Sequence, residues 1–579
     1  MTYMKQYLTW LNNPYFDQET KDELKSIENH PKEIEERFYK DLEFGTGGLR
    51  GVIGAGTNRM NIYTVRRATQ GFANYLLKQV TQAKEKGVAI AYDSRHKSPE
   101  FAQEAALVLN ANGIKAYVFE SLRTTPELSF AVRHLGCAGG IVITASHNPP
   151  AYNGYKVYGE DGGQIVPHLA EKIIEEIQQI EDYSQVGYVE KEAALSTGML
   201  HMIGEDVDKK YIEAVKELAL RKEIIQSVGK DMKVVYTPLH GTGNMPVRRV
   251  LKELGFQNVM VVPEQELPDA NFSTVKSPNP EEHEAFTLAL DLADKINAEV
   301  ILGTDPDCDR VGVVVKNKEG IYQVLTGNQT GALLVDYVLS AMQEQNILPS
   351  NGVVIKTIVT SEMGAQIAKA FGMDTLDTLT GFKFIGEKIQ QFEKSQEKQF
   401  LFGYEESYGY LAGTFVRDKD AVIASMLICE MAAYYKSKDM TLYDALINLY
   451  KKYGYYKEDL VSITLQGKEG IEKIQGILDH FRAQPPKTIG GKTIRILRDY
   501  KTGKVQNLMT DEIGTLTLPA SNVLHFTMED GSWFCVRPSG TEPKVKLYFS
   551  VVGSNLADSE NQLNAFKEGV MEIIHNLIQ

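Results

Sequence analysis

Three segments of this chain repeat one pattern of short apolar runs and helical stretches, and each ends in a dense polar motif. The first segment covers residues 87–149, the second starts at Lys233 and the third starts at Val353. This alternation is typical of β-α-β-α-β units. Because ligands of open α/β sheets bind beyond the carboxyl ends of strands, the three motifs are expected to serve ligand binding.

The rest of the chain differs from this pattern at both ends. The first 40 residues have the spacing of amphipathic helices, and short strands with a last helix near 559–578 dominate after residue 450. At roughly 150 residues per domain, 579 residues correspond to about four domains. We expect three related α/β domains with mixed sheets and a smaller C-terminal α+β domain. The predicted boundaries are 1–206, 207–325, 326–450 and 451–579.

The composition excludes several classes of protein. A net charge of -14 repels nucleic acid and anionic membrane surfaces, and no apolar run reaches the roughly 18 residues of a membrane span. The N-terminal residues lack the pattern of a secretory signal, and the four cysteines are scattered without a CxxC pair. We expect a cytoplasmic protein without nucleic-acid or membrane partners, in which a local basic pocket meets any anionic substrate.

TASHNP, residues 144–149, places Ser146 at the end of a predicted strand among turn-forming residues. It is not a nucleophile elbow, because Thr144 and Asn148 stand where that motif needs glycine. The motif therefore predicts either a serine presented to a ligand or one that caps the next turn.

GTDPDCDR, residues 303–310, contains Asp305, Asp307 and Asp309 in a segment that we expect to be extended. Alternation along an extended chain would turn the three carboxylates to one side, where a divalent cation such as Mg²⁺ relieves their repulsion. An EF-hand is excluded because Arg310 and Lys316 stand where its loop needs Gly and Glu. A solvated acidic loop is the alternative.

VRPSGTEPK, residues 536–544, follows a predicted strand and has the composition of an anion-binding turn. Backbone amides of such a turn and the Arg537 guanidinium can hold phosphate oxygens, although an ordinary turn is the alternative. GTGGLRG, residues 45–51, is a second Gly-rich loop with one arginine, and it matches neither a Walker A loop nor GxGxxG.

GYEESYGY, residues 403–410, ends the third segment with side chains suited to sugar hydroxyls. Glu405 and Glu406 could instead indicate glycoside hydrolysis, but neighbours on an extended strand point to opposite sides and would not flank one bond. Capping of the next helix is the other alternative.

Together and in this order, the five motifs resemble those of the α-D-phosphohexomutase family, the phosphoglucomutases and phosphomannomutases. The resemblance spans nearly the whole chain and implies four domains around a central cleft. It implies a phosphoserine at Ser146, also an oxygen ligand of Mg²⁺ with Asp305, Asp307 and Asp309. It further implies Lys156, Arg50 and Arg310 beside the reacting phosphate, and substrate contacts from His147, Lys383, Glu405, Ser407, Arg537, Ser539, Gly540 and Thr541.

The resemblance also implies a reaction. A phosphoserine would interconvert glucose 1-phosphate and glucose 6-phosphate through glucose 1,6-bisphosphate, which also acts as activator, in a monomer or small homo-oligomer. Lys156 is preferred over His147 for proton transfer, because the side chains of neighbours at a strand end usually point apart. Phosphopentomutase and phosphomannomutase remain alternatives, and a sugar-phosphate-binding protein or a metal-dependent phosphatase are more distant ones.

Overall fold

The computed structural model describes residues 2–45, 47–465, 467–539 and 544–578. The chain divides into two compact units, one of residues 1–327 and 382–442 and the other of residues 328–381 and 443–579. None of the helices in the described part of the chain combines the length and apolarity needed to cross a bilayer. The first unit contains four of the five motifs.

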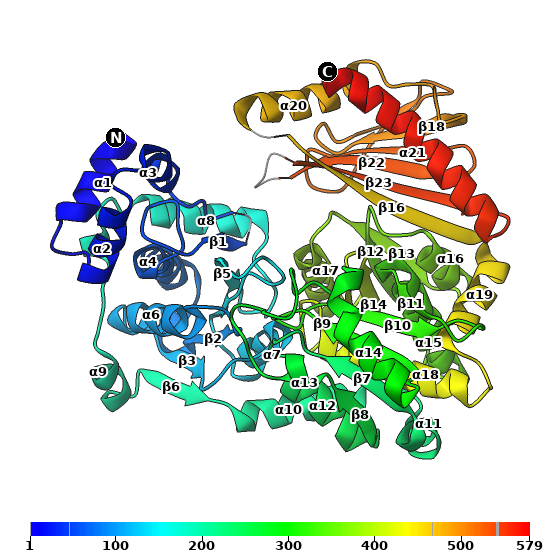
Figure 1. Cartoon of the computed structure of the whole chain (residues 1–579), viewed down its shortest axis with the longest axis horizontal. Helices are drawn as coiled ribbons and strands as arrows, with labels where there is room; N and C mark the ends of the chain where they lie inside the picture. The colour runs from blue at the N-terminus through cyan, green and yellow to red at the C-terminus, as the bar shows by residue number, and fades with distance from the viewer. Residues whose placement is uncertain (1, 46, 466, 540–543, 579) are drawn as a thin grey trace. The chain divides into compact units, whose positions relative to one another are not determined.

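The first sheet of this unit, drawn in blue to cyan in Figure 1, carries TASHNP at the end of an inner strand. Its strands lie in the order β1 (Gly48–Val52), β5 (Tyr152–Tyr158), β4 (Gly139–Ile143), β2 (Val88–Tyr92), β3 (Ala116–Phe119) and β6 (Leu200–Ile203). The strands β2, β3, β4 and β6 are parallel, whereas β5 runs antiparallel to β4 and β1 antiparallel to β5. The helices are α4 (Ile62–Gln79), α6 (Ser98–Ala111), α7 (Thr125–His134) and α8 (Pro167–Gln178). Parallel strands buried on both faces explain the continuous apolar runs in the sequence.

The second sheet carries the aspartate motif between two adjacent strands. The order is β11 (Tyr322–Leu325), β10 (Val311–Lys316), β9 (Val300–Thr304), β7 (Lys233–Thr237) and β8 (Asn258–Val261). The helices are α10 (Glu205–Glu217), α11 (Lys222–Ser227), α12 (Asn244–Leu254), α13 (Pro263–Glu266) and α14 (Thr287–Ile296). Because β10 runs antiparallel to β9, the chain must reverse within residues 305–310.

The third segment contributes a hairpin and two helices to this unit. The hairpin pairs β14 (Gln399–Glu405) with β15 (Gly409–Ala412), so GYEES lies at its turn. Around it in the chain are α17 (Phe382–Ser395) and α18 (Ala421–Lys436), the latter packed against α11, α12 and β15.

The predicted N-terminal helices are present as α1 (Tyr3–Asn12), α2 (Gln18–Ser26) and α3 (Pro31–Phe38). They enclose a small aromatic core in which Trp10 stacks on Phe16 at 4.2 Å between ring centroids. Tyr63 of α4 joins the same core, so this helical segment packs on the first sheet's helices. It contains none of the predicted site residues.

The second unit contains β12 (Gly352–Thr357) parallel to β13 (Asp374–Thr378), with α15 (Gly327–Glu344), α16 (Met363–Ala370) and α19 (Leu442–Tyr453). Its C-terminal part is the predicted α+β domain. The strands lie in the order β16 (Tyr455–Thr464), β23 (Lys544–Gly553), β22 (Trp533–Pro538), β21 (Leu524–Met528), β18 (Lys492–Asp499), β19 (Lys504–Asn507) and β20 (Ile513–Thr515), and β17 (Thr488–Ile489) pairs with β18.

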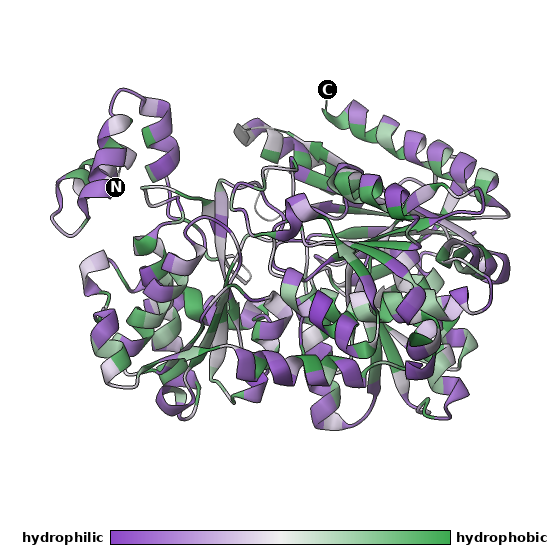
Figure 2. Cartoon of the chain, turned by 60° about the horizontal axis from the view of Figure 1, so that its bottom comes forward, coloured by the Kyte–Doolittle hydropathy of each residue, from purple (hydrophilic) through white to green (hydrophobic). Residues whose placement is uncertain are grey.

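Two helices, α20 (Gly467–Ala483) and α21 (Leu556–Ile578), share an apolar core with this sheet. Figure 2 shows hydrophilic and hydrophobic residues alternating along α21, as expected for a helix with one buried face. The predicted fold class, α/β domains with mixed sheets followed by an α+β domain, is confirmed.

Candidate active site

Ser146 lies just beyond β4 in an unusual backbone conformation. Its φ is +51°, in the left-handed region that non-glycine residues rarely adopt, and its amide donates to Oγ1 of Thr144 at 2.8 Å. Its hydroxyl is buried and donates to Oδ2 of Asp305 at 2.7 Å. Nδ1 of His147 lies 3.1 Å from the Ser146 hydroxyl oxygen. The expectation that Ser146 and His147 point apart is wrong, because the left-handed residue turns the chain and brings both side chains together.

Asp93 and Arg95, which follow β2, hold the serine loop (residues 144–149) in place. Both side chains are fully buried, and Nε of Arg95 lies 3.3 Å from Oδ2 of Asp93. The Arg95 guanidinium donates to the backbone carbonyls of Ser146 and Asn148. Because both carbonyls belong to the same short loop, this one side chain fixes its path.

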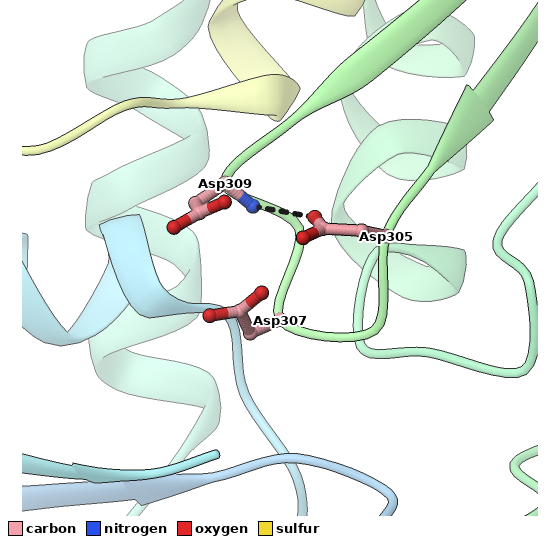
Figure 3. A group of neighbouring side chains, drawn as sticks. All are labelled: Asp305, Asp307 and Asp309. Carbon is pink, nitrogen blue, oxygen red and sulfur yellow. Dashed lines mark hydrogen bonds between the residues drawn. The ribbon is translucent and has the colours of Figure 1, made fainter. Parts of the chain in front are cut away.

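The three predicted aspartates converge at one point (Figure 3). One carboxylate oxygen from each of Asp305, Asp307 and Asp309 lies within 4.8 Å of the others, and all three residues are buried. The expected extended conformation is wrong: Cys308 has a φ of +55° and its amide donates to the carbonyl of Asp305 at 2.9 Å. A turn therefore brings the carboxylates together, because the chain must reverse between β9 and β10.

The three carboxylates of the triad repel one another. Burial and the negative charges of Asp307 and Asp309 raise the pKa of Asp305 well above its usual range. Burial would also raise the pKa of Asp307, but the positive charge of Lys156 outweighs it and holds the pKa below the usual range. The protein alone thus leaves one carboxyl of the triad poorly compensated.

A divalent cation fits this group of residues. Oδ1 of Asp307 and Oδ1 of Asp309 are buried and, within the described residues, accept no hydrogen bond. Buried carboxylate oxygens without donors are costly unless a charge of opposite sign compensates them. Hard oxygen ligands in a compact set suit Mg²⁺.

Besides Arg95, four cationic side chains among the described residues lie near the serine and the triad. Nζ of Lys156 donates to Oδ2 of Asp307 at 2.8 Å, and Nζ of Lys419 lies 3.1 Å from Oδ2 of Asp309. Arg310 pairs with Glu281 at 2.5 Å. Arg50 donates to the Asn148 side chain at 3.4 Å. Lys156, Lys419 and Arg310 are each paired with a carboxylate, and the local basic pocket expected from the acidic composition stays a prediction.

The protonation states of these groups follow from their surroundings. Burial acts to lower the pKa of Lys156, but the charges of Asp307 and Asp309 outweigh it and the pKa is raised, so the amine is a cation. Burial, with added repulsion from Arg310, lowers the pKa of His147 well below its usual range. The imidazole beside Ser146 is therefore neutral.

The predicted sugar-contacting residues lie in the same unit. Glu405 is buried at the end of β14 and its charge helps to raise the pKa of Lys419, while Ser407 is half-buried in the hairpin turn. Lys383, in the first turn of α17, lines a cavity of about 390 Å³ together with Tyr158. Their contacts with a sugar stay predictions.

The predicted phosphate loop follows β22 in the second unit. Arg537 occupies that strand opposite Lys546 of β23, and its Nη1 donates to the Tyr548 hydroxyl at 3.4 Å. The amide of Ser539 donates to the carbonyl of Lys544 at 2.7 Å, which closes the loop at its base. Gly540 and Thr541 lie outside the described residues.

Comparison with known families matches most of the chain between residues 41 and 563. The description "Phosphoglucomutase/phosphomannomutase, alpha/beta/alpha domain I" matches residues 41–184, domain II matches 209–320 and domain III matches 326–453, while the C-terminal domain of the same family matches 493–563. The chain belongs to the phosphoglucomutase/phosphomannomutase family. The predicted enzyme class, an isomerase that acts by intramolecular phosphoryl transfer, is thereby confirmed.

Individual relatives agree with this assignment. A phosphoglucomutase of Staphylococcus aureus is 38% identical over 567 residues, which cover 97% of this chain and 99% of the relative. The solved structure of pp63/parafusin, a phosphoglucomutase from Paramecium, shares the fold with a TM-score of 0.66 at 18% identity, covering 93% of this chain and 95% of that one. Aspergillus fumigatus N-acetylphosphoglucosamine mutase, solved in complex with GlcNAc-6P and magnesium, has a TM-score of 0.51 at 12% identity, covering 92% and 96%.

Sequence reasoning missed three residues of this site: Asp93, Arg95 and Lys419. The first two lie in DSRH at the carboxyl end of β2, next to β4 in the sheet, so the strand-end rule that found Ser146 applies to them too. Lys419 lies in RDKD before α18, where a cluster of charges was the available signal.

Proposed function

We propose that this chain interconverts glucose 1-phosphate and glucose 6-phosphate through enzyme-bound glucose 1,6-bisphosphate, with Ser146 carrying the transferred phosphoryl group. The observation that carries this proposal is the position of the Ser146 hydroxyl, 2.7 Å from the buried aspartate triad and beside a neutral imidazole. The relatives named phosphoglucomutase favour glucose among the possible sugars.

Asp305, Asp307 and Asp309 would hold Mg²⁺ together with an oxygen on Ser146. When bound there, the cation would supply positive charge that offsets the negative charge of the transferred phosphoryl group. The magnesium in the Aspergillus relative supports this choice of cation. The pairing of Lys156 with Asp307 places a protonated amine beside the same carboxylates.

Side chains near Ser146 would bind phosphate oxygens and transfer protons. Lys156, Arg50 and Arg310 supply positive charge for phosphate oxygens, which is the main contribution a protein makes to phosphoryl transfer. Nδ1 of His147 lies 3.1 Å from the Ser146 hydroxyl oxygen and would donate a hydrogen bond to that oxygen when the imidazole carries its proton on Nδ1. Lys156 is protonated, so it would give a proton to the oxygen that leaves the phosphoryl group and recover one from the oxygen that attacks. The leaving oxygen is Oγ of Ser146 in the first transfer and the sugar oxygen in the return transfer.

Substrate recognition is assigned to residues predicted from the motifs. Lys383, Glu405 and Ser407 would bind sugar hydroxyls, with His147 near the reacting end. Arg537, Ser539, Gly540 and Thr541 would bind the phosphate that is not being transferred. A loop that accepts either phosphate lets the bisphosphate return its other phosphoryl group to Ser146. A cytoplasmic location and a monomer or small homo-oligomer also stay predictions from the sequence.

The first test replaces the serine. Ser146→Ala should lower the conversion of glucose 1-phosphate to glucose 6-phosphate roughly 10⁴-fold or more, even with added glucose 1,6-bisphosphate, because no oxygen remains to carry the phosphoryl group. Ser196→Ala is the matched control, since that exposed hydroxyl donates only to a carbonyl of its own helix. A Ser146→Ala enzyme that retains substantial activity would overturn the mechanism.

The same preparation tests the substrate. Rates with the 1-phosphates of glucose, mannose, glucosamine and ribose should be highest for glucose. A higher rate with mannose or ribose would reassign the enzyme to phosphomannomutase or phosphopentomutase, and stoichiometric release of inorganic phosphate would identify a phosphatase.

A further inference from the structure

One strained aromatic residue in the second sheet's loops has no role in the function proposed above. Phe272 is 1% exposed and has a φ of +48°, which is a genuine outlier for a bulky side chain. Such a conformation costs roughly 1–3 kcal/mol and persists only where the surroundings hold it. Phe272 belongs to the segment between α13 and the turn before α14, residues 267–282, called here the linking loop.

Phe272 covers the side chain that fixes the serine loop. The Arg95 guanidinium carbon lies 4.9 Å from the centroid of the Phe272 ring. On its other edges this guanidinium donates to the carbonyls of Ser146, Asn148 and Pro149. An aromatic face over a cation attracts it and excludes water, which would otherwise compete for its donors.

The linking loop also contacts the site at two further places. The Ser277 hydroxyl donates to the carbonyl of His147 at 3.4 Å, and Glu281 pairs with Arg310 of the aspartate loop at 2.5 Å. One short segment therefore contacts both the loop that carries the phosphoryl group and the loop that would hold the cation.

The linking loop is itself held firmly in this shape. Both oxygens of Asp269 accept backbone hydrogen bonds within the loop, from Asn271 and Ser273 at 2.9 Å each. The imidazole of His240 bonds to the carbonyl of Leu267 at 2.9 Å and to the hydroxyl of Thr274 at 2.8 Å. These contacts flank Phe272 on both sides and hold its backbone in the left-handed region.

We propose that Phe272 is a positioning residue for phosphoryl transfer: its ring holds Arg95, and through Arg95 it sets the place of Ser146 relative to the aspartate triad. This inference rests on the proposed function, in which Ser146 carries the phosphoryl group. A displacement of reacting atoms by about 1 Å can cost on the order of 100-fold in rate, so such a contact matters without touching the substrate.

The test compares Phe272→Ala and Phe272→Leu with wild type, and uses Lys276→Ala as the matched control. Lys276 lies in the same linking loop with its side chain 83% exposed. Phe272→Ala should lower kcat by about 10- to 100-fold with KM within about twofold, because binding residues stay in place while the serine moves. Phe272→Leu keeps an apolar side chain over Arg95. On a logarithmic scale, its fall in kcat should be at most half of the fall in Phe272→Ala.

A second readout does not depend on activity. Hydrogen exchange of the backbone amides of residues 144–149 should become faster in Phe272→Ala than in wild type, and should not change in Lys276→Ala. All measurements are made where circular dichroism shows each variant fully folded. If Phe272→Ala does not fold, the test uses Phe272→Leu alone. This variant should lower kcat by about 3- to 10-fold, because it loses the free energy of a buried cation–π contact.

Either of two results would overturn the proposal. The first is a kcat of the folded variant within about twofold of wild type. The second is unchanged exchange in the serine loop, which would show that Phe272 only packs the core. An inactive wild-type enzyme would instead count against the proposed function, and the exchange data would still decide whether Phe272 holds the serine loop.

Discussion

Two buried clusters of three carboxyl groups occur among the described residues of the first unit, and one of these two fits a metal ion. The metal triad is Asp305, Asp307 and Asp309. The second cluster is Glu127 of α7, Asp208 of α10 and Asp420 at the start of α18, and each of these residues is 2% exposed or less. Burial and the number of carboxyl groups therefore do not distinguish them.

The clusters differ in geometry, because among the described residues only the triad brings three ligand oxygens within 4.8 Å of one another, and they differ in what compensates the negative charge. Arg123 donates to both oxygens of Asp208, at 2.9 and 2.8 Å. Asp420 accepts the Tyr211 hydroxyl at 2.8 Å and two backbone amides at the start of α18. Burial and the charge of Asp208 raise the pKa of Glu127 well above its usual range, so this group is a neutral acid. The second cluster is thus already neutralised by the protein.

In the metal triad, by contrast, a single turn contributes all three carboxylates, and two of their oxygens accept no hydrogen bond among the described residues. In the second cluster such an oxygen is Oε2 of Glu127, which belongs to a neutral acid. A metal site needs converging oxygens that protein donors leave available. Three predictions test whether this difference in compensation is the cause.

The largest effect is expected for the metal triad. Asp307→Ala should lower Mg²⁺ affinity at least about 100-fold and reduce the mutase rate by roughly 10³-fold, since loss of the cation removes several kcal/mol of transition-state stabilisation. Asp420→Asn, which can still cap α18, should bind Mg²⁺ like wild type. Calorimetric titration of the chelator-treated proteins with Mg²⁺ measures the affinity of both variants. Equal loss in the two variants would contradict the distinction between the clusters.

A smaller effect, on stability, is expected for the second cluster. Asp208→Ala leaves the guanidinium of Arg123 buried without its carboxylate, so the free energy of unfolding should fall by about 3–5 kcal/mol. Urea denaturation followed by circular dichroism measures this change. Mg²⁺ affinity of the folded variant should be unaltered, and a loss below about 1 kcal/mol would show that the ion pair is not what neutralises the cluster.

The smallest effect concerns pH. Burial raises the pKa of Asp420 from its ordinary 3.8 to about 7. The folded state therefore binds this proton more tightly than the unfolded state, and the resulting stability is complete below about pH 4 and lost as the pH rises through about 7. The difference in unfolding free energy between wild type and Asp420→Asn should fall by about 1 kcal/mol per pH unit between pH 5 and 7. A difference that is constant with pH would contradict the raised pKa.

Much of the site could be predicted because its motifs are local. Ser146 and the three aspartates stand at strand ends that apolar runs reveal, and the donor chemistry of each motif can be read from a few adjacent residues. The domain boundaries 1–206, 207–325, 326–450 and 451–579 stay predictions, since the matched family segments leave gaps between them.

The orientation of the side chains could not be predicted in the same way. Ser146 and His147 were expected to point apart, and the aspartate segment was expected to be extended, because both expectations assumed regular strand geometry. Left-handed residues at Ser146 and Cys308 break that geometry, and they are held by contacts with distant parts of the chain. Lys419 reaches Asp309 from α18's N-terminal side, which no local pattern indicates.

The sequence by itself determined the element types, the class of each motif and, through the order of the motifs, the family. Periodicity and side-chain chemistry are local properties, so a linear reading is sufficient for them. Only the tertiary structure decided which charges meet: that Asp305 accepts from Ser146, that Lys156 offsets Asp307, and that Phe272 covers Arg95. The reason is physical, because burial and distance set the pKa values and hydrogen bonds, and both depend on residues far apart in the chain.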